Sequence, residues 1–181
     1  MTHPQRVPES VRLVIFDIDG VLTDGALWYG EHGEVVKPFN AKDGVGFRLL
    51  QDNGIEVAVI TAKQSAPLAR RMADLKVRHF YPGCHDKRAA FHQLLDTLGI
   101  MPEAVAYVGD DVLDLPVMEL VGWPVAPADA YPMVLEQAAW VTQAVGGRGV
   151  VREVADTLVA ARTNLVEAYR RLVAPAEAIV Q

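Results

Sequence analysis

The residues best suited to chemistry are two groups of aspartates that each follow an apolar run. Asp17 and Asp19 come after residues 11–16, and a second group after residues 104–108 contains Asp110, Asp111 and Asp114. Strand periodicity points Asp17 and Asp19 to the same side. Carboxylates this close repel one another unless a cation lies between them. A hard divalent cation that prefers oxygen ligands, most simply Mg²⁺, therefore fits the pattern.

Turn formation is the competing interpretation of these aspartates, because Asp and Gly are common turn residues. An EF-hand loop starting at Asp17 is excluded, since its sixth and twelfth positions hold Leu22 and Trp28 instead of Gly and Glu. Asp114 can also cap a helix that begins near Leu115. Capping that helix and supporting a metal are compatible roles.

A hydroxyl and an ammonium are expected at the same place. Thr61 follows the apolar run 55–60, and Lys87 opens a predicted helix. Taken singly, Thr61 is also explained as a strand-end turn and Lys87 as a solvated surface lysine. Together with two carboxylates and a metal, they suit phosphoryl transfer, because cations offset the charge of the transferring group while the hydroxyl positions its oxygens.

The elements that must position these residues alternate along the chain. Strands are predicted at 11–16, 55–60, 79–81, 104–108 and 123–126, and helices at 44–53, 66–75 and 87–98. The longer strands show little polar alternation, as expected of parallel strands buried on both faces. The pattern predicts an α/β fold, a Rossmann-like three-layer sandwich with a central, mostly parallel sheet.

Two further segments interrupt this alternation. Residues 26–39 combine two short β-prone runs with a Gly-containing turn, which predicts a β-hairpin flap after the first strand. Residues 150–172 carry apolar side chains spaced three and four apart, which predicts one helix of about six turns. That helix can pack on its own domain or face another subunit. Residues 175–181 are expected to form a loose tail.

Length and composition limit the function classes. With 181 residues, the chain is expected to form one domain over 1–181, without a separate cap domain. Its formal net charge of 17 − 23 = −6 argues against general nucleic-acid binding. Cys84 is the single cysteine and is interpreted as part of a plain loop. Without a signal peptide or membrane span in the sequence, a cytoplasmic protein is expected.

The ordered motifs resemble those of the haloacid dehalogenase superfamily of phosphatases. They are Asp17-x-Asp19, Thr61, Lys87 and Gly109-Asp110-Asp111-x-x-Asp114. Residues 10–160 look like its small cap-less branch, which contains the phosphatases of 3-deoxy-D-manno-octulosonate 8-phosphate (KDO 8-phosphate). The resemblance implies Mg²⁺-dependent hydrolysis of a phosphorylated sugar acid in lipopolysaccharide precursor synthesis.

Each motif residue takes a role by this resemblance. Asp17 would attack phosphorus to form an aspartyl phosphate, and Asp19 would serve as general acid and then general base. Mg²⁺ would be held by Asp17, the backbone carbonyl of Asp19, and Asp110. Asp111 and Asp114 would support these ligands, and Thr61 and Lys87 would hold phosphoryl oxygens.

The resemblance also implies a substrate site and an oligomer. Substrate contacts would come from Gly20, Ala62, Lys63 and Arg148. Related enzymes carry arginine at the position of Lys63, and lysine lacks the fork that suits a carboxylate. A nine-carbon relative, 2-keto-3-deoxynononate 9-phosphate, or a broader range of sugar phosphates is therefore the alternative substrate. The protein would form a homotetramer whose subunits are joined through their hairpins. Neighbouring subunits would then cover each active site.

Two interpretations from other functional classes remain. A phospho-receiver signalling domain also combines acidic residues, a threonine and a lysine on an α/β sheet. Asp19 favours the enzyme, because a receiver has no such acid/base partner beside its phospho-aspartate. A regulatory subunit that keeps the fold without turnover is disfavoured by the intact motif set.

Overall fold

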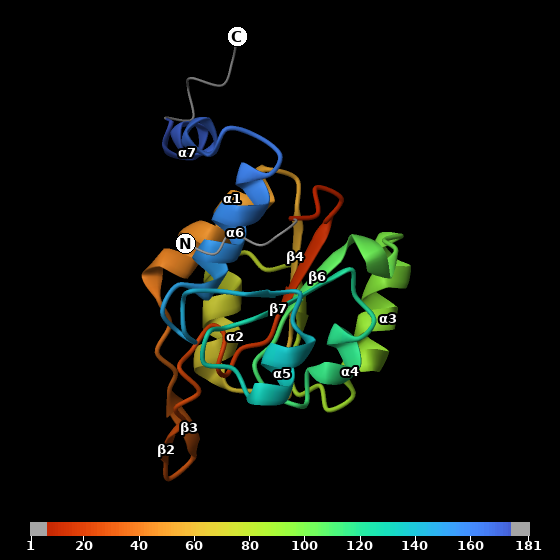
Figure 1. The fold of residues 1–181 in the computed structure, drawn as a ribbon. Coiled ribbons are helices and arrows are strands. Elements are labelled where there is room, and N and C mark those ends of the chain that lie inside the picture. Colours follow the sequence, from red (N-terminus) through yellow and green to blue (C-terminus); the bar gives the residue numbers. More distant parts are fainter. Residues whose placement is uncertain (1–6, 175–181) are drawn as a thin grey trace.

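The computed structural model describes residues 7–174 and centres on a six-stranded parallel sheet (Figure 1). The strand order is β5-β4-β1-β6-β7-β8. These strands are β1 (Leu13–Phe16), β4 (Glu56–Ile60), β5 (His79–Tyr81), β6 (Val105–Val108), β7 (Trp123–Ala126) and β8 (Trp140–Val141). Every pairing in the sheet is parallel, which confirms the predicted fold class.

Helices cover both faces of the sheet and give the predicted three layers. One apolar cluster joins Val14 and Phe16 of β1 to α1 (Ala41–Asp52), α2 (Ala66–Asp74), α6 (Val150–Ala160) and α7 (Leu165–Val173). The other joins Leu13 and Ile15 to α3 (Lys87–Leu98), α4 (Leu115–Met118) and α5 (Pro132–Gln137). Alternate residues of β1 thus enter opposite layers, as the pleat of a strand requires. A short 3₁₀ helix, Pro102–Ala104, precedes β6.

Local side-chain caps decide where α1 and α3 begin. The Asn40 side chain accepts a hydrogen bond from the Lys42 N–H at 2.9 Å, so α1 starts a few residues before the predicted 44–53. Asp86 caps α3 by accepting from the Ala89 N–H at 3.0 Å. As a result Lys87 is the first residue of α3, as predicted.

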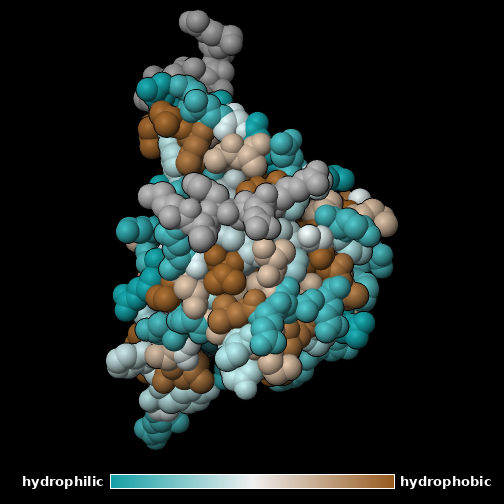
Figure 2. Space-filling model, in the orientation of Figure 1, coloured by the Kyte–Doolittle hydropathy of each residue, from teal (hydrophilic) through white to brown (hydrophobic). Residues whose placement is uncertain are grey.

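The predicted hairpin consists of β2 (Trp28–Gly30) and β3 (Gly33–Val36), which pair antiparallel. It projects from the lower end of the molecule in Figures 1 and 2. Trp28 and Tyr29 are 57% and 65% exposed, so the hairpin does not bury them against its own chain.

The prediction of one continuous helix over 150–172 is wrong. Helix α6 ends at Ala160, and α7 begins at Leu165 after a turn. The physical reason is Asn164, whose side chain accepts from the Glu167 N–H at 3.1 Å and caps a new helix. The apolar side chains of this segment still pack together despite the break, because Val154 and Leu158 of α6 and Leu172 of α7 all belong to one cluster.

Residues 175–181, where a tail is predicted, lie outside the described residues. Within 7–174, no helix is both long and apolar enough to cross a membrane.

Candidate active site

The sheet register brings the predicted motif residues to one edge. Phe16, the last residue of β1, lies opposite Val59 on one side and Val108 on the other. The Asp17 N–H donates to the Val108 carbonyl at 3.0 Å. Residues after β1, β4 and β6 therefore meet at the carboxyl ends of adjacent strands, where open α/β sheets bind ligands. The cleft there is lined by Asp17, Asp19, Gly20, Gly25, Thr61, Ala62, Lys63, Lys87, Asp110, Asp111, Leu113 and Asp114.

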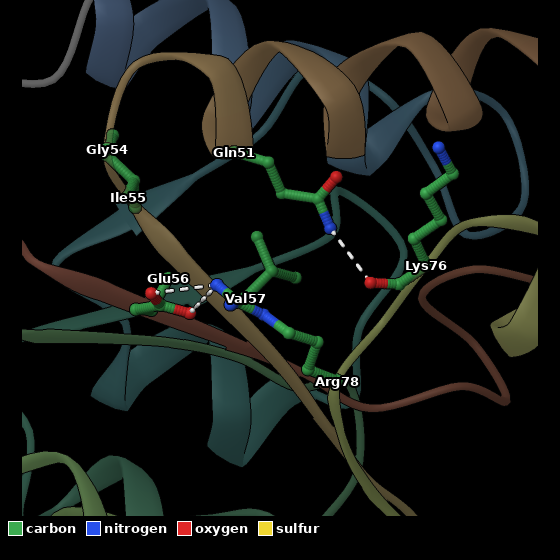
Figure 3. A pocket seen from close by; sticks show the side chains of 7 residues that line it. All are labelled: Gln51, Gly54, Ile55, Glu56, Val57, Lys76 and Arg78. Carbon is green, nitrogen blue, oxygen red and sulfur yellow. Dashed lines mark hydrogen bonds and ion pairs between the residues drawn. The ribbon is translucent and has the colours of Figure 1, made fainter.

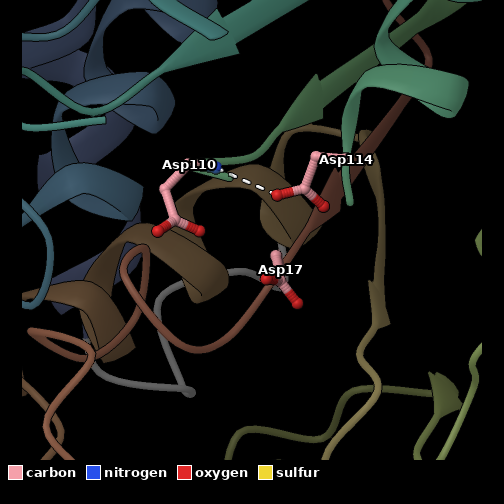
Figure 4. Close-up of side chains that lie close together, drawn as sticks. All are labelled: Asp17, Asp110 and Asp114. Atoms are coloured by element: carbon pink, nitrogen blue, oxygen red, sulfur yellow. Dashed lines mark hydrogen bonds between the residues drawn. The ribbon is translucent and has the colours of Figure 1, made fainter. Parts of the chain in front are cut away.

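Three carboxylates converge at the floor of this cleft (Figure 4). Asp17, Asp110 and Asp114 each place one oxygen within 4.8 Å of the others. Burial, followed by the charge of Asp114, raises the pKa of Asp17 to about 7 and that of Asp110 to about 8. Oδ1 of Asp110 is buried and has no hydrogen-bond partner within residues 7–174. A hard divalent cation fits this group, because it supplies the missing charge and takes oxygen ligands.

Asp114 is fully buried, and its oxygens are occupied by the protein. Oδ1 accepts from Lys87 Nζ at 2.7 Å and from the Tyr107 hydroxyl at 2.6 Å. Oδ2 accepts from the backbone N–H groups of Asp110 at 3.0 Å and Asp111 at 3.3 Å. Asp114 therefore holds both the lysine and the loop that carries Asp110.

Tyr107 was not a sequence candidate. A phenol within an otherwise aliphatic buried strand was the signal that could have identified it. Its hydroxyl bonds Asp114, and burial together with that carboxylate raises its pKa well above the usual value. Tyr107 is therefore a neutral donor that helps to fix the position of the Asp114 carboxylate.

Lys87 pairs with two of the three carboxylates, and one of them is Asp17, the predicted nucleophile. Its Nζ lies 3.0 Å from Oδ1 of Asp17 and 2.7 Å from Oδ1 of Asp114. Burial alone would lower the pKa of Lys87, but the two carboxylates outweigh it and raise the pKa. A buried ammonium beside Asp17, with its pKa raised, suits a site that receives an anionic group.

The loop after β4 forms another wall of the cleft. Thr61 is buried, and its hydroxyl oxygen accepts from the Lys63 N–H at 3.2 Å. Thr61, Ala62 and Lys63 thus lie beside Asp17, as predicted.

Asp19 is held by residues that were not predicted. The ammonium of Lys37, which follows β3, pairs with Oδ1 of Asp19 and with Glu34. The Thr23 hydroxyl also bonds Asp19 Oδ1, at 3.3 Å. The base of the hairpin therefore reaches the cleft.

Two predicted site residues, Asp111 at the cleft and Arg148 outside it, are exposed. Asp111 is exposed, and its Oδ1 accepts from the next backbone N–H, that of Val112, at 2.7 Å. Arg148 is exposed and lines a separate hollow with Asp24, Phe39 and Asn40. Within one chain, Arg148 does not line the cleft that holds the other candidates.

A further hollow lies at the opposite end of β4 (Figure 3). Its Arg78 and Glu56 side chains are joined by hydrogen bonds of 3.1 and 3.2 Å, and Gln51 donates to the Lys76 carbonyl at 3.4 Å. These groups satisfy one another, and no carboxylate cluster of the described residues lies there. The cleft at the carboxyl ends of the strands is therefore the candidate active site.

Gly20 makes room for Asp110, and this leads to a prediction. A Cβ built at Gly20 would lie 1.9 Å from Asp110 Oδ2, so Gly20→Ala must displace that carboxylate. We expect Gly20→Ala to weaken Mg²⁺ binding about tenfold or more, measured by titration calorimetry.

Gly25→Ala is the matched control for this substitution. Gly20 and Gly25 have φ of +81° and +77°, so both variants carry similar backbone strain. The nearest atom to a Cβ at Gly25 is 3.7 Å away, which leaves Asp110 in place. Equal loss of Mg²⁺ binding in the two variants would contradict the steric explanation.

Comparisons with known proteins show the family of this chain. Residues 76–154 match the family model of haloacid dehalogenase-like hydrolases. The chain is 48% identical over 167 residues to the 3-deoxy-D-manno-octulosonate 8-phosphate phosphatase of Salmonella typhi, which covers 92% of this chain and 89% of the relative.

Solved structures show the same similarity. The crystal structure of the enzyme of that name from Yersinia pestis matches with a TM-score of 0.85 and 47% identity, over 87% of this chain and 85% of the other. The Moraxella catarrhalis enzyme, in complex with magnesium, phosphate and KDO, matches with a TM-score of 0.86 and 32% identity, over 91% and 94%. The chain therefore belongs to the haloacid dehalogenase-like hydrolases, in the family of the 3-deoxy-D-manno-octulosonate 8-phosphate phosphatases.

Proposed function

We propose that this chain is a Mg²⁺-dependent phosphatase that converts KDO 8-phosphate to KDO and phosphate. The observation that carries the proposal is the position of Asp17, which lies 3.0 Å from the Lys87 ammonium and belongs to the carboxylate group that fits a divalent cation. The named activity of its relatives and the KDO complex of the Moraxella enzyme support the substrate. Family membership also favours a hydrolase over a phospho-receiver domain.

The proposed reaction has two steps carried by Asp17 and Asp19. A carboxylate oxygen of Asp17 attacks phosphorus, and the bond to the sugar oxygen breaks as Asp19 gives that oxygen a proton. Asp19 then takes a proton from the water that hydrolyses the aspartyl phosphate, which restores both residues. Lys87 and Thr61 hold phosphoryl oxygens during both steps. Mg²⁺ bound by Asp17, Asp110 and the Asp19 carbonyl would offset the charge that develops on the phosphoryl group.

The assignment is tested by phosphate release from a panel of substrates in the presence of Mg²⁺. The panel contains KDO 8-phosphate, the nine-carbon 2-keto-3-deoxynononate 9-phosphate and hexose phosphates. We expect the highest kcat/KM for KDO 8-phosphate. Similar low values for every substrate would leave a phosphatase but contradict the sugar-acid assignment.

Lys63 is the proposed contact for the sugar acid. Its side chain lies near Glu34 of the hairpin. Burial raises the pKa of Glu34, but the hydrogen bond with Lys37 and, to a smaller extent, the charge of Lys63 lower it overall. Replacing Lys63 with alanine is expected to raise KM for the sugar acid and to leave kcat for a hexose phosphate unchanged. An unchanged KM would remove Lys63 from the substrate contacts.

We further propose a homotetramer in the cytoplasm, with hairpins joined and neighbouring subunits covering each cleft. The exposed apolar residues Trp28, Tyr29, Val35 and Val36 support this, because such a patch is rarely left open to water. In that assembly Arg148 would reach toward a neighbour's site. The proposed place in lipopolysaccharide precursor synthesis follows from the substrate.

Sedimentation tests the assembly. The wild-type protein is expected to sediment at about four times its 19.7 kDa chain mass, as the proposed tetramer requires. Trp28→Glu is expected to shift it to smaller species, because it places a charge in the joined hairpins. Met133→Glu, at a residue that is 54% exposed on α5, is the control and should leave the mass unchanged. A wild-type protein that is monomeric at micromolar concentration would contradict the proposal that neighbouring subunits cover each cleft.

A further inference from the structure

Lys37 is a buried lysine between two carboxylates. It directly follows β3, and its side chain is 0% exposed. Its ammonium pairs with Oδ1 of Asp19 and lies 2.8 Å from Oε1 of Glu34. Burying an ammonium is costly unless charged partners surround it, and here both partners are supplied. Lys37 therefore ties the base of the hairpin to the loop that carries Asp19.

The two carboxylate oxygens of Asp19 have unlike surroundings. Oδ1 accepts from Lys37 Nζ and from the Thr23 hydroxyl. Oδ2 is buried without a hydrogen-bond partner among the described residues, although Asp19 lines the cleft. One oxygen is thus fixed by the protein, and the other is left for a ligand in the cleft.

The Thr23 hydroxyl alone cannot hold the orientation of the Asp19 carboxylate. Its hydroxyl lies 3.3 Å from Asp19 Oδ1 and 3.5 Å from the Ile18 carbonyl, and it also accepts from the Gly25 N–H at 3.3 Å. These contacts are long and shared. A charge-assisted hydrogen bond from an ammonium is stronger than one from a neutral hydroxyl. Lys37 is therefore the main restraint on the carboxylate of Asp19.

Building on the proposed function, we propose that Lys37 is a positioning residue that holds Oδ1 of Asp19 and thereby presents Oδ2 to the reacting oxygen. Glu34 anchors the ammonium from the hairpin side. The hairpin then contributes to each step in which Asp19 transfers a proton, in addition to covering the cleft. Small errors in the position of a proton-transferring group lower the rate strongly, since a displacement of about 1 Å can reduce it about 10²-fold.

The test compares Lys37→Met and Lys37→Arg with the wild-type enzyme. Lys37→Met keeps an unbranched side chain and removes the ammonium, so kcat is expected to fall about 10²-fold. KM should stay unchanged, because Lys37 contacts Asp19 and not the substrate. Lys37→Arg retains a cationic donor and is expected to recover most of kcat. Lys42→Met, at an exposed lysine of α1, is the control and should behave as wild type.

Three measurements besides activity separate positioning from general damage. Calorimetry with Mg²⁺ alone should give the wild-type affinity for Lys37→Met, and its thermal unfolding should remain cooperative. If this variant does not fold, Lys37→Gln, which keeps a polar donor, is judged by the same criteria. A crystal structure of the folded variant should show the Asp19 carboxylate turned from its wild-type orientation.

Several outcomes would overturn the proposal. The first is an unchanged kcat in Lys37→Met, and the second is a rise in its KM as large as the fall in its kcat. The third is a Lys37→Arg variant that is as slow as Lys37→Met. The fourth is an Asp19 carboxylate that keeps its wild-type orientation in the structure of Lys37→Met. The substrate panel with wild-type enzyme decides the proposed function separately. The comparison of variants can use any phosphomonoester that the wild type hydrolyses.

Discussion

Asp17→Asn is expected to abolish phosphate release, with kcat lower by roughly 10⁵-fold or more, as when a covalent nucleophile is removed. The amide has the volume of the carboxylate but lacks the charge and the nucleophilic oxygen. Asp114 is not free to replace it, because its oxygens already accept from Lys87, Tyr107 and two backbone N–H groups. The measurement is steady-state release of phosphate from KDO 8-phosphate with Mg²⁺.

Thermal unfolding of the same variant without Mg²⁺ separates chemistry from folding. The pKa of Asp17 is raised to about 7 from an ordinary 3.8, mainly by burial and then by Asp114. A carboxyl with a raised folded-state pKa is destabilising where it is ionised, so above pH 7 its charge opposes folding. Asp17→Asn should therefore unfold at or above the wild-type temperature at pH 8.

The control for Asp17→Asn is Asp96→Asn, since Asp96 is exposed on α3 and does not line the cleft. It should retain most activity. Residual turnover by Asp17→Asn close to the wild-type rate would remove Asp17 as nucleophile. A clearly lower unfolding temperature would show that the pairing with Lys87 outweighs the cost of burying Asp17.

Much of the fold could be predicted because it depends on local patterns. Apolar runs such as 57–60 lie between helical segments, and a parallel sheet with helices on both faces buries these runs. The ends of those runs then fix the site, since a parallel register brings Asp17, Thr61 and Asp110 to one edge. The hairpin followed from the same kind of local signal, a Gly-containing turn between β-prone runs.

The features that were missed depend on capping and tertiary contacts. The helix predicted over 150–172 kept its apolar spacing through the break, so periodicity could not detect it. The sequence signal was Asn164 followed three residues later by Glu167, a capping pattern. Strand β8 has two residues, too few for any period. Lys37 lies 18 residues from Asp19, and only the folded hairpin brings them together.

The electrostatics of the carboxylate group make Mg²⁺ binding the second large effect. Without a cation, burial and mutual repulsion raise the pKa of Asp17 to about 7 and of Asp110 to about 8. Below these values the groups hold protons that a cation must displace. Mg²⁺ affinity is therefore expected to rise between pH 6 and pH 8, by up to about tenfold per pH unit for each proton released. Chelation should abolish turnover, and added Mg²⁺ should restore it.

Calorimetry with Mg²⁺ alone tests this prediction, because buffers with different ionisation heats report the number of protons released. Asp110→Asn removes a proposed metal ligand, which is also one of the two carboxyl groups whose pKa is raised. It should bind Mg²⁺ much more weakly and release fewer protons at pH 7. An affinity for the wild type that does not change from pH 6 to pH 8 would mean that the cation does not bind between Asp17 and Asp110. The same result would place the metal elsewhere and leave Lys87 as the charge that balances Asp17.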